Sequence, residues 1–105
     1  ERTDKMQVII EAEDKTLTAF LSGEIDHHSA AEIRSDIDLA VERHKPEKLV
    51  LDFREVTFMD SSGIGLVMGR CRTMQLIGGT VAVENTTPQI KKVMHLSGLD
   101  LIAKI

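Results

Sequence analysis

The segment FMDSSGIG, residues 58–65, places two hydroxyl groups beside a carboxylate, between an apolar pair and two glycines. An apolar run with helical spacing follows, so the segment lies where the chain enters a helix. Three kinds of chemistry fit these residues. Asp60, Ser61 and Ser62 can cap the helix, one serine can act as a nucleophile, or one serine can accept a phosphoryl group from a partner. Spacing alone favours the cap.

A hydrolytic nucleophile fits this segment poorly. Hydrolases with a strand-to-helix elbow carry the pattern G-x-S-x-G, whereas this chain has MDSSG at residues 59–63. His27 and His28 are the available bases, but acidic neighbours oppose the formation of an oxyanion, and no other donor for an oxyanion is evident. The sequence therefore argues against hydrolysis by Ser61.

A dinucleotide site is a second alternative, because Gly63, Gly65 and Gly69 form G-x-G-x-x-x-G and Glu84 ends the next predicted strand. The dinucleotide fingerprint, however, places its first glycine directly after a strand. Here ten positions separate Phe53 from Gly63. Packing of a helix against the sheet explains the second and third glycines equally well.

A phospho-acceptor receiver domain is a third alternative. The acids Glu11, Glu13 and Asp14 follow the first predicted strand, and Asp52 ends the apolar run LVLD. A receiver domain needs a helix between its first two strands, whereas this chain passes directly from EAEDK to TLTAFLS. The lysine expected after a fifth strand is also absent from the sequence.

Composition and charge exclude further classes. The chain has 105 residues, a net charge of −4 and 3% aromatic residues, which argues against binding to nucleic acid. No apolar stretch reaches the roughly 18–20 residues of a membrane span. The single Cys71 cannot form an internal disulfide, so we expect a cytoplasmic protein. The histidines are either consecutive, as in His27 and His28, or on separate elements, as in His44 and His95, so neither a metal site nor a cofactor is predicted.

Hydrophobic periodicity predicts one α/β domain over residues 1–105, with an N-terminal β-hairpin followed by β-α-β-α-β-α. Strands are expected at Val8–Ile10, Thr16–Ser22, Lys48–Phe53 and Thr80–Glu84, a short last strand at Leu101–Ile105, and helices at Ala30–Arg43 after a Ser29 cap, after the DSSG segment up to Gly78, and from Pro88 to a left-handed cap at Gly98. The sheet should be mostly parallel, with the helices mainly on one face. Within the predicted helices, Val93 should point inward and Arg70 away from the core, and Leu39 has no assigned role.

The carboxyl ends of parallel strands meet at one edge of a sheet, which is the usual place for function in α/β folds. That edge gathers GEIDHHS and REVTFMDSSG, and so predicts that Asp26, His27, Asp60, Ser61 and Ser62 are neighbours. A phosphate on Ser61 would meet the free N–H groups and the positive dipole end of a helix. Gly63 would leave backbone space for a kinase to approach.

Three longer segments resemble a known family. In order, GEIDHHSA, LVLDFREVTFMDSSGIG and LIGGTVAVENTTPQIKKVMHLSGL resemble the STAS family of anti-sigma factor antagonists. The Asp-His-His loop narrows the resemblance to the sporulation branch of that family. The resemblance covers essentially the whole chain and implies a STAS fold and a partner-switching regulator of transcription rather than an enzyme.

The resemblance also implies partners and residue roles. The unphosphorylated protein is expected to bind an ATP- or ADP-bound anti-sigma factor that is also a serine kinase, and so to release the sigma factor. The kinase then phosphorylates Ser61, and a serine phosphatase of the PP2C type restores the protein. The expected partner-binding residues are Asp26, His27, His28, Asp60, Ser62, Gly63 and Ile64. The alternative is a small nucleotide- or ligand-binding module that uses the same edge, and no direct contact with nucleic acid or membrane is expected.

Overall fold

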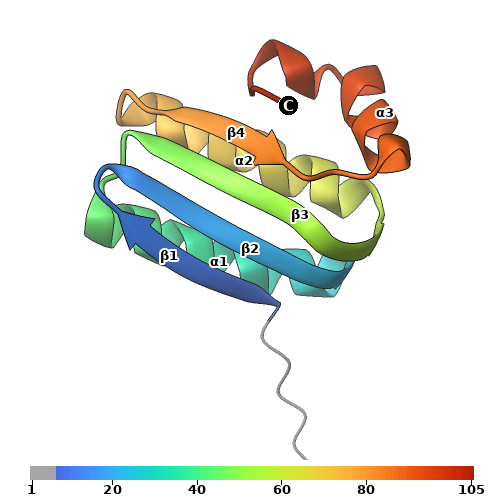
Figure 1. Cartoon of the computed structure of the whole chain (residues 1–105), viewed down its shortest axis with the longest axis horizontal. Coiled ribbons are helices and arrows are strands. Elements are labelled where there is room, and N and C mark those ends of the chain that lie inside the picture. The colour runs from blue at the N-terminus through green and yellow to red at the C-terminus, as the bar shows by residue number, and fades with distance from the viewer. Residues whose placement is uncertain (1–6) are drawn as a thin grey trace, which may run out of the picture.

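The computed structural model describes residues 7–105 and contains a four-stranded sheet in the order β1-β2-β3-β4 (Figure 1). Its elements are β1 (Val8–Glu13), β2 (Thr16–Ile25), α1 (His27–His44), β3 (Lys48–Met59), α2 (Ser61–Leu76), β4 (Thr80–Glu84), α3 (Pro88–Leu96) and a 3-10 helix, η1 (Leu99–Leu101). The first two strands are antiparallel, and β2, β3 and β4 are parallel. The predicted α/β fold with an N-terminal hairpin is confirmed.

The helices divide into two groups. The long helices α1 and α2 lie side by side against one face of the sheet, whereas α3 and η1 lie beyond the β4 edge (Figure 1). The C-terminal segment follows that edge, because Val83 donates to the carbonyl of Lys104 and Lys104 donates to the carbonyl of Val81. Within residues 7–105, no helix is both long and apolar enough to cross a membrane.

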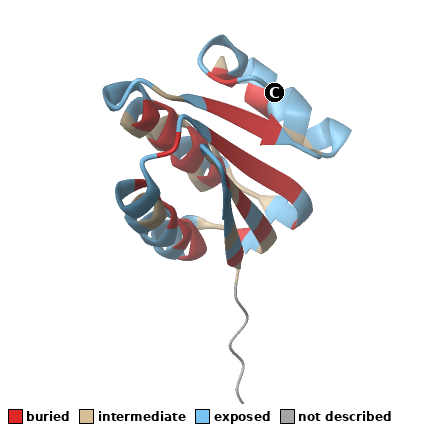
Figure 2. Ribbon diagram, turned by 60° about the vertical axis from the view of Figure 1, so that its left-hand side comes forward, coloured by how far each residue is buried: buried red, intermediate tan, exposed pale blue. Residues whose placement is uncertain are grey.

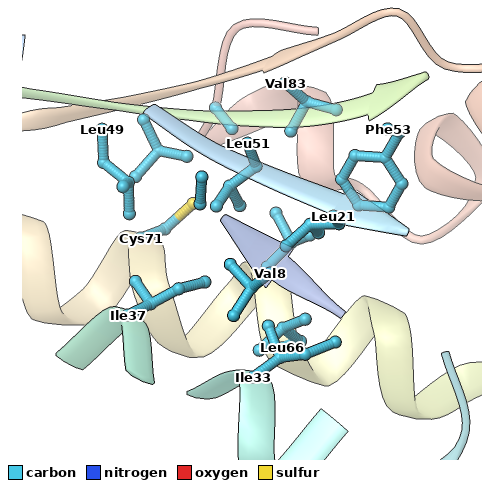
Figure 3. Close-up of a cluster of buried hydrophobic side chains, with 14 of the residues drawn as sticks. Val8, Leu21, Ile33, Ile37, Leu49, Leu51, Phe53, Leu66, Cys71 and Val83 are labelled. Atoms are coloured by element: carbon cyan, nitrogen blue, oxygen red, sulfur yellow. The ribbon is translucent and has the colours of Figure 1, made fainter. Parts of the chain in front are cut away.

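The core lies between α1, α2 and the sheet (Figure 3). Ile33 and Ile37 of α1 and Leu66 and Cys71 of α2 point toward the strands. The strands contribute a larger set of buried aliphatic and aromatic side chains, which includes Leu17, Leu21, Leu49, Leu51, Phe53 and Val83. Burial of one such side chain contributes about 1.5–3 kcal/mol, so this layer fixes α1 and α2 on the sheet.

Three strands are longer than predicted. β1 continues to Glu13, and the turn is formed by Asp14, whose φ is 56°, with Lys15. β2 and β3 continue to Ile25 and Met59, since their ends pair with each other after small register shifts. The polar residues in these ends interrupt the apolar pattern by which strands are predicted. Here the strands are stabilised by pairing as well as by burial.

The C-terminal part differs more from expectation. The predicted strand at Leu101–Ile105 is wrong: η1 forms instead, and only Lys104 bridges to β4. Gly98 has the predicted left-handed conformation, with a φ of 80°, and turns the chain so that Leu99 is buried. Much of α3 is exposed (Figure 2). Val93 is 44% exposed rather than inward, and Met94 is the buried residue of this helix.

Candidate functional site

Two helices begin next to each other at the carboxyl edge of the sheet. Ile25 at the end of β2 pairs with Met59 at the end of β3, and the N–H of Asp60 donates to the carbonyl of Ile25 at 3.1 Å. Asp26 and Asp60 are therefore the next residues on two adjacent strands, and each is the N-cap of the helix that follows. The predicted gathering of the two loops at one edge is confirmed.

Asp26 closes a capping box at the start of α1. Its carboxylate accepts from the backbone N–H of Ser29 at 2.9 Å, and the Ser29 hydroxyl accepts from the N–H of Asp26 at 2.9 Å. The prediction that Ser29 is the N-cap is wrong, because α1 begins at His27 and Ser29 is its third residue. The amide of Ser29 lowers the pKa of Asp26, so this residue presents a carboxylate at neutral pH.

Asp60 performs the same task for α2. Its carboxylate accepts from the N–H of Ser62 at 2.8 Å, and its carbonyl accepts from the N–H of Gly63 at 3.0 Å. Ser61 is the first residue of the helix and is exposed, and its hydroxyl forms no hydrogen bond within residues 7–105. Asp60 rather than Ser61 caps the helix, so the serine hydroxyl is presented to solvent.

The expected free N–H groups at this helix start are thus partly occupied. The amides of Ser62 and Gly63 already bond to Asp60. A phosphate on Ser61 would compete with the Asp60 carboxylate for the same positive end of α2. This competition was not foreseen from the sequence, because the spacing does not show which side chain caps the helix.

The two histidines lie on different sides of α1. His27 lines a hollow between the helices together with Ser62, Gly65 and Arg34. His28 is directed to Glu32, with 3.3 Å between Nε2 and Oε2, and lines a separate hollow that includes Asp26. Only His27 therefore shares a hollow with a residue of the DSSG motif. Among the described residues, no group of three His, Cys, Asp or Glu side chains could hold a metal ion.

The glycines of α2 have roles other than those inferred from spacing. Gly63 is buried, and a Cβ there would overlap the side chain of Met59, so packing rather than access to a kinase requires this glycine. Gly65 and Gly69 were expected to pack against the sheet. A Cβ at either position would meet no atom within 4 Å, so neither glycine makes that contact. Ile64 is half-buried and packs against the core.

Two residues extend the candidate surface beyond the prediction. Phe58, near the end of β3, is 52% exposed and lies two positions before Asp60. Arg34 lies in the same hollow as His27 and Ser62. The seven-residue interval from His27 to Arg34, two helical turns, was the available signal for the arginine. For Phe58, the available signal was the apolar pair Phe58-Met59 directly before Asp60.

Asp52 is a buried, hydrogen-bonded residue with a structural role, and its surroundings are not those of a phospho-acceptor. It is buried, its Oδ1 accepts from the N–H of Arg54 at 2.9 Å, and its Oδ2 accepts from the Asn85 side chain at 2.8 Å. Oδ2 therefore ties β3 to the residue that follows β4, whereas Oδ1 makes a local contact within β3.

The chain is similar to known proteins in both sequence and fold. The sequence pattern of the STAS domain matches residues 7–105. The anti-sigma F factor antagonist of Paenibacillus polymyxa is 36% identical over 100 residues, which cover 95% of this chain and 86% of that protein. The unphosphorylated anti-sigma factor antagonist SpoIIAA superposes with a TM-score of 0.80 and 34% identity, over 91% of this chain and 84% of that one. The phosphorylated form of Bacillus SpoIIAA superposes with a TM-score of 0.74 and 34% identity, over 91% of this chain and 87% of that one.

Proposed function

This chain belongs to the STAS domain family, and on that basis we propose that it is an anti-sigma factor antagonist switched off by phosphorylation of Ser61. Its unphosphorylated form binds an anti-sigma factor and so frees a sigma factor for transcription during sporulation. The anti-sigma factor is also a serine kinase that binds ATP or ADP, and a phosphatase of the PP2C type reverses the modification. That the chain is a regulator and not an enzyme is confirmed by its family membership.

The exposed position of Ser61 is the observation that carries this proposal. Because Asp60 makes the capping hydrogen bond to Ser62, the Ser61 hydroxyl is not needed to start α2. The hydroxyl is available to a kinase without local unfolding. Ser62 is less suitable, because it is half-buried whereas Ser61 is exposed.

The same geometry supports a mechanism by which phosphorylation would release a partner. Phosphoserine adds about −1.5 to −2 charges at pH 7. This charge arrives beside Asp60, and the Asp26 carboxylate caps the neighbouring helix. In the complex, Ser61 must also face the nucleotide of the kinase, whose phosphates are negative. Repulsion between like charges in a partly dehydrated interface is stronger than in water, so the phosphorylated protein dissociates.

The partner surface that we propose surrounds Ser61 and spans both helix starts. Its members are Asp26, His27, His28, Asp60, Ser62, Gly63 and Ile64, with Phe58 and Arg34 added from the structure. Phe58 supports the proposal because it is an exposed aromatic residue near the end of β3, and aromatic residues are enriched in the cores of protein interfaces. Gly63 contributes indirectly, since Met59 fills the space beside it.

Reconstitution tests this function. The purified chain is titrated against its cognate anti-sigma factor with ADP, and release of the sigma factor is followed by fluorescence anisotropy. The unphosphorylated chain should displace the sigma factor in proportion to its concentration, and the enzymatically phosphorylated chain should not. Equal displacement by both forms, or displacement by neither, would contradict the proposal.

A further inference from the structure

An open hollow lies between the C-terminal halves of α1 and α2, at the end of the helix pair away from Ser61. Its volume is about 740 Å³, and its wall includes Arg34, Asp38, Leu39, Lys45, Arg70 and Ile77. We refer to it as the α1–α2 hollow. Arg34 also lines the smaller hollow that contains His27 and Ser62, but no other residue is common to both walls.

Arg70 is the unusual residue of the α1–α2 hollow. Its side chain is only 7% exposed, although the sequence predicted that it points away from the core. Its Nε lies 3.0 Å from Oδ1 of Asp38, but these atoms do not form a well-directed hydrogen bond, and the buried Nη1 has no acceptor among the described residues. A guanidinium stays protonated in proteins, so the cost of its unpaired donors cannot be relieved by losing the proton.

The charges around Arg70 favour an additional anion. Arg34 is close enough to repel Arg70, and burial lowers the pKa of Arg70 while Asp38 opposes that effect. Asp38 is itself 40% exposed, and the Nζ of Lys45 donates to the backbone carbonyl of Glu42. The hollow is thus lined by the carboxylates of Asp38 and Glu42 and by three cations, Arg34, Lys45 and Arg70, which leaves one positive charge in excess. The planar donor geometry of a guanidinium suits a carboxylate or a phosphate.

The wall of the hollow beside these charges is apolar. Leu39, which had no role in the sequence, is 55% exposed, and Ile77 is 48% exposed. Both line the α1–α2 hollow. Exposed aliphatic side chains next to unpaired donors match a ligand with an apolar chain and a charged end.

We propose that the α1–α2 hollow binds a small aliphatic oxyanion, a carboxylate or phosphate attached to an alkyl chain. The oxyanion lies against Arg70 and Arg34, and the chain lies against Leu39 and Ile77. The site does not include Ser61 and does not depend on the proposed partner switch, although it shares Arg34 with the proposed partner surface.

Four probes separate binding of the oxyanion from binding of the alkyl chain. They are octanoate, octyl phosphate, octanol and inorganic phosphate. Each is titrated into the isotope-labelled full chain below its micelle concentration, and methyl and guanidinium NMR signals are recorded. Octanoate and octyl phosphate should shift Leu39, Ile77 and Arg70 in a saturable manner. Octanol and inorganic phosphate should each bind at least about tenfold more weakly, since each lacks one part of the ligand. Octanol binding as strongly as octanoate, or shifts that map elsewhere, would overturn the proposal.

Matched variants test the charged contacts. Arg70→Met should weaken octanoate binding at least about tenfold, whereas Arg72→Met, at an exposed arginine of the same helix, should not. Asp38→Asn removes the competing carboxylate and keeps both guanidiniums, so it should strengthen binding. If Arg70→Met does not fold, the exposed Arg34→Gln must weaken binding instead. Unchanged binding in the foldable arginine variants, or weaker binding in Asp38→Asn, would refute an oxyanion site here.

Discussion

Adding one methyl group at Gly63 tests the packing that holds the start of α2 over the end of β3. A Cβ at this buried position would overlap Cγ and Sδ of Met59. Overpacking of this kind costs about 1–3 kcal/mol. An alanine also gains helix propensity over glycine, by about 0.8–1.0 kcal/mol in a helix interior. We therefore expect Gly63→Ala to destabilise the fold by about 0–2 kcal/mol.

Gly65→Ala is the matched control on the same helix. A Cβ at Gly65 meets no atom within 4 Å, so only the propensity gain applies. This variant should be more stable than the wild type by about 0.5–1 kcal/mol. The two alanine variants should therefore differ by about 1–3 kcal/mol, or at least about 4 °C in melting temperature for a domain of this size.

Urea and thermal unfolding, followed by circular dichroism, measure this difference. The cause is checked by adding Met59→Ala to each variant. In the shortened background, Gly63→Ala should lose its penalty, because the overlapping Cγ and Sδ are gone. If Gly63→Ala is as stabilising as Gly65→Ala in the wild-type background, the contact between Met59 and Gly63 does not determine the start of α2 and the reasoning fails.

Three further predictions concern single side chains. Asp26→Asn should have a melting temperature close to that of the wild type at neutral pH, because asparagine also caps helices, yet it should weaken the complex with the anti-sigma kinase in a titration. Because the folded pKa of Asp26 is lowered, its contribution is present above about pH 4 and lost as the pH falls through the folded pKa, so acid should reduce the melting temperature of the wild type more than that of Asp26→Asn. Ser61→Asp should bind the ADP-loaded kinase at least about tenfold more weakly than Ser61→Asn, and equal affinities would mean that release is steric. Burial raises the pKa of the Cys71 thiol, so a thiol reagent should label it only as fast as the protein unfolds, and rapid labelling of the native chain would contradict its buried position.

The order of the elements was predictable because each of them has a recognisable apolar periodicity. The positions at which β2 and β3 end were not predictable. The missed ends are Gly23 to Ile25 and Arg54 to Met59. They contain glycine and charged residues, and their strand conformation depends on pairing between β2 and β3, which no local pattern shows. The prediction of a last strand at Leu101–Ile105 was wrong for a related reason. This segment meets β4 only through the isolated bridge between Ala82 and Lys104, and the local sequence pattern does not show how far such a long-range pairing extends.

The candidate site was predictable in location but not in detail. The topology placed both acidic loops at one edge, and the family resemblance singled out Ser61. The sequence does not show which residue caps which helix, and it therefore predicts a Ser29 cap where Asp26 supplies it. Arg70 was misplaced because a charged residue within an amphipathic helix is expected at the surface, and only tertiary packing against α1 buries it beside Asp38.

We propose that Ser61 is the acceptor that switches this protein between partners. The most direct test is incubation of the wild type, Ser61→Ala and Ser62→Ala with the cognate anti-sigma kinase and ATP, followed by mass-spectrometric mapping. The wild type and Ser62→Ala should each gain one phosphate on Ser61, and Ser61→Ala should bind the kinase but gain none. Stoichiometric phosphorylation of Ser61→Ala, or a phosphate that maps to Ser62 in the wild type, would contradict the account.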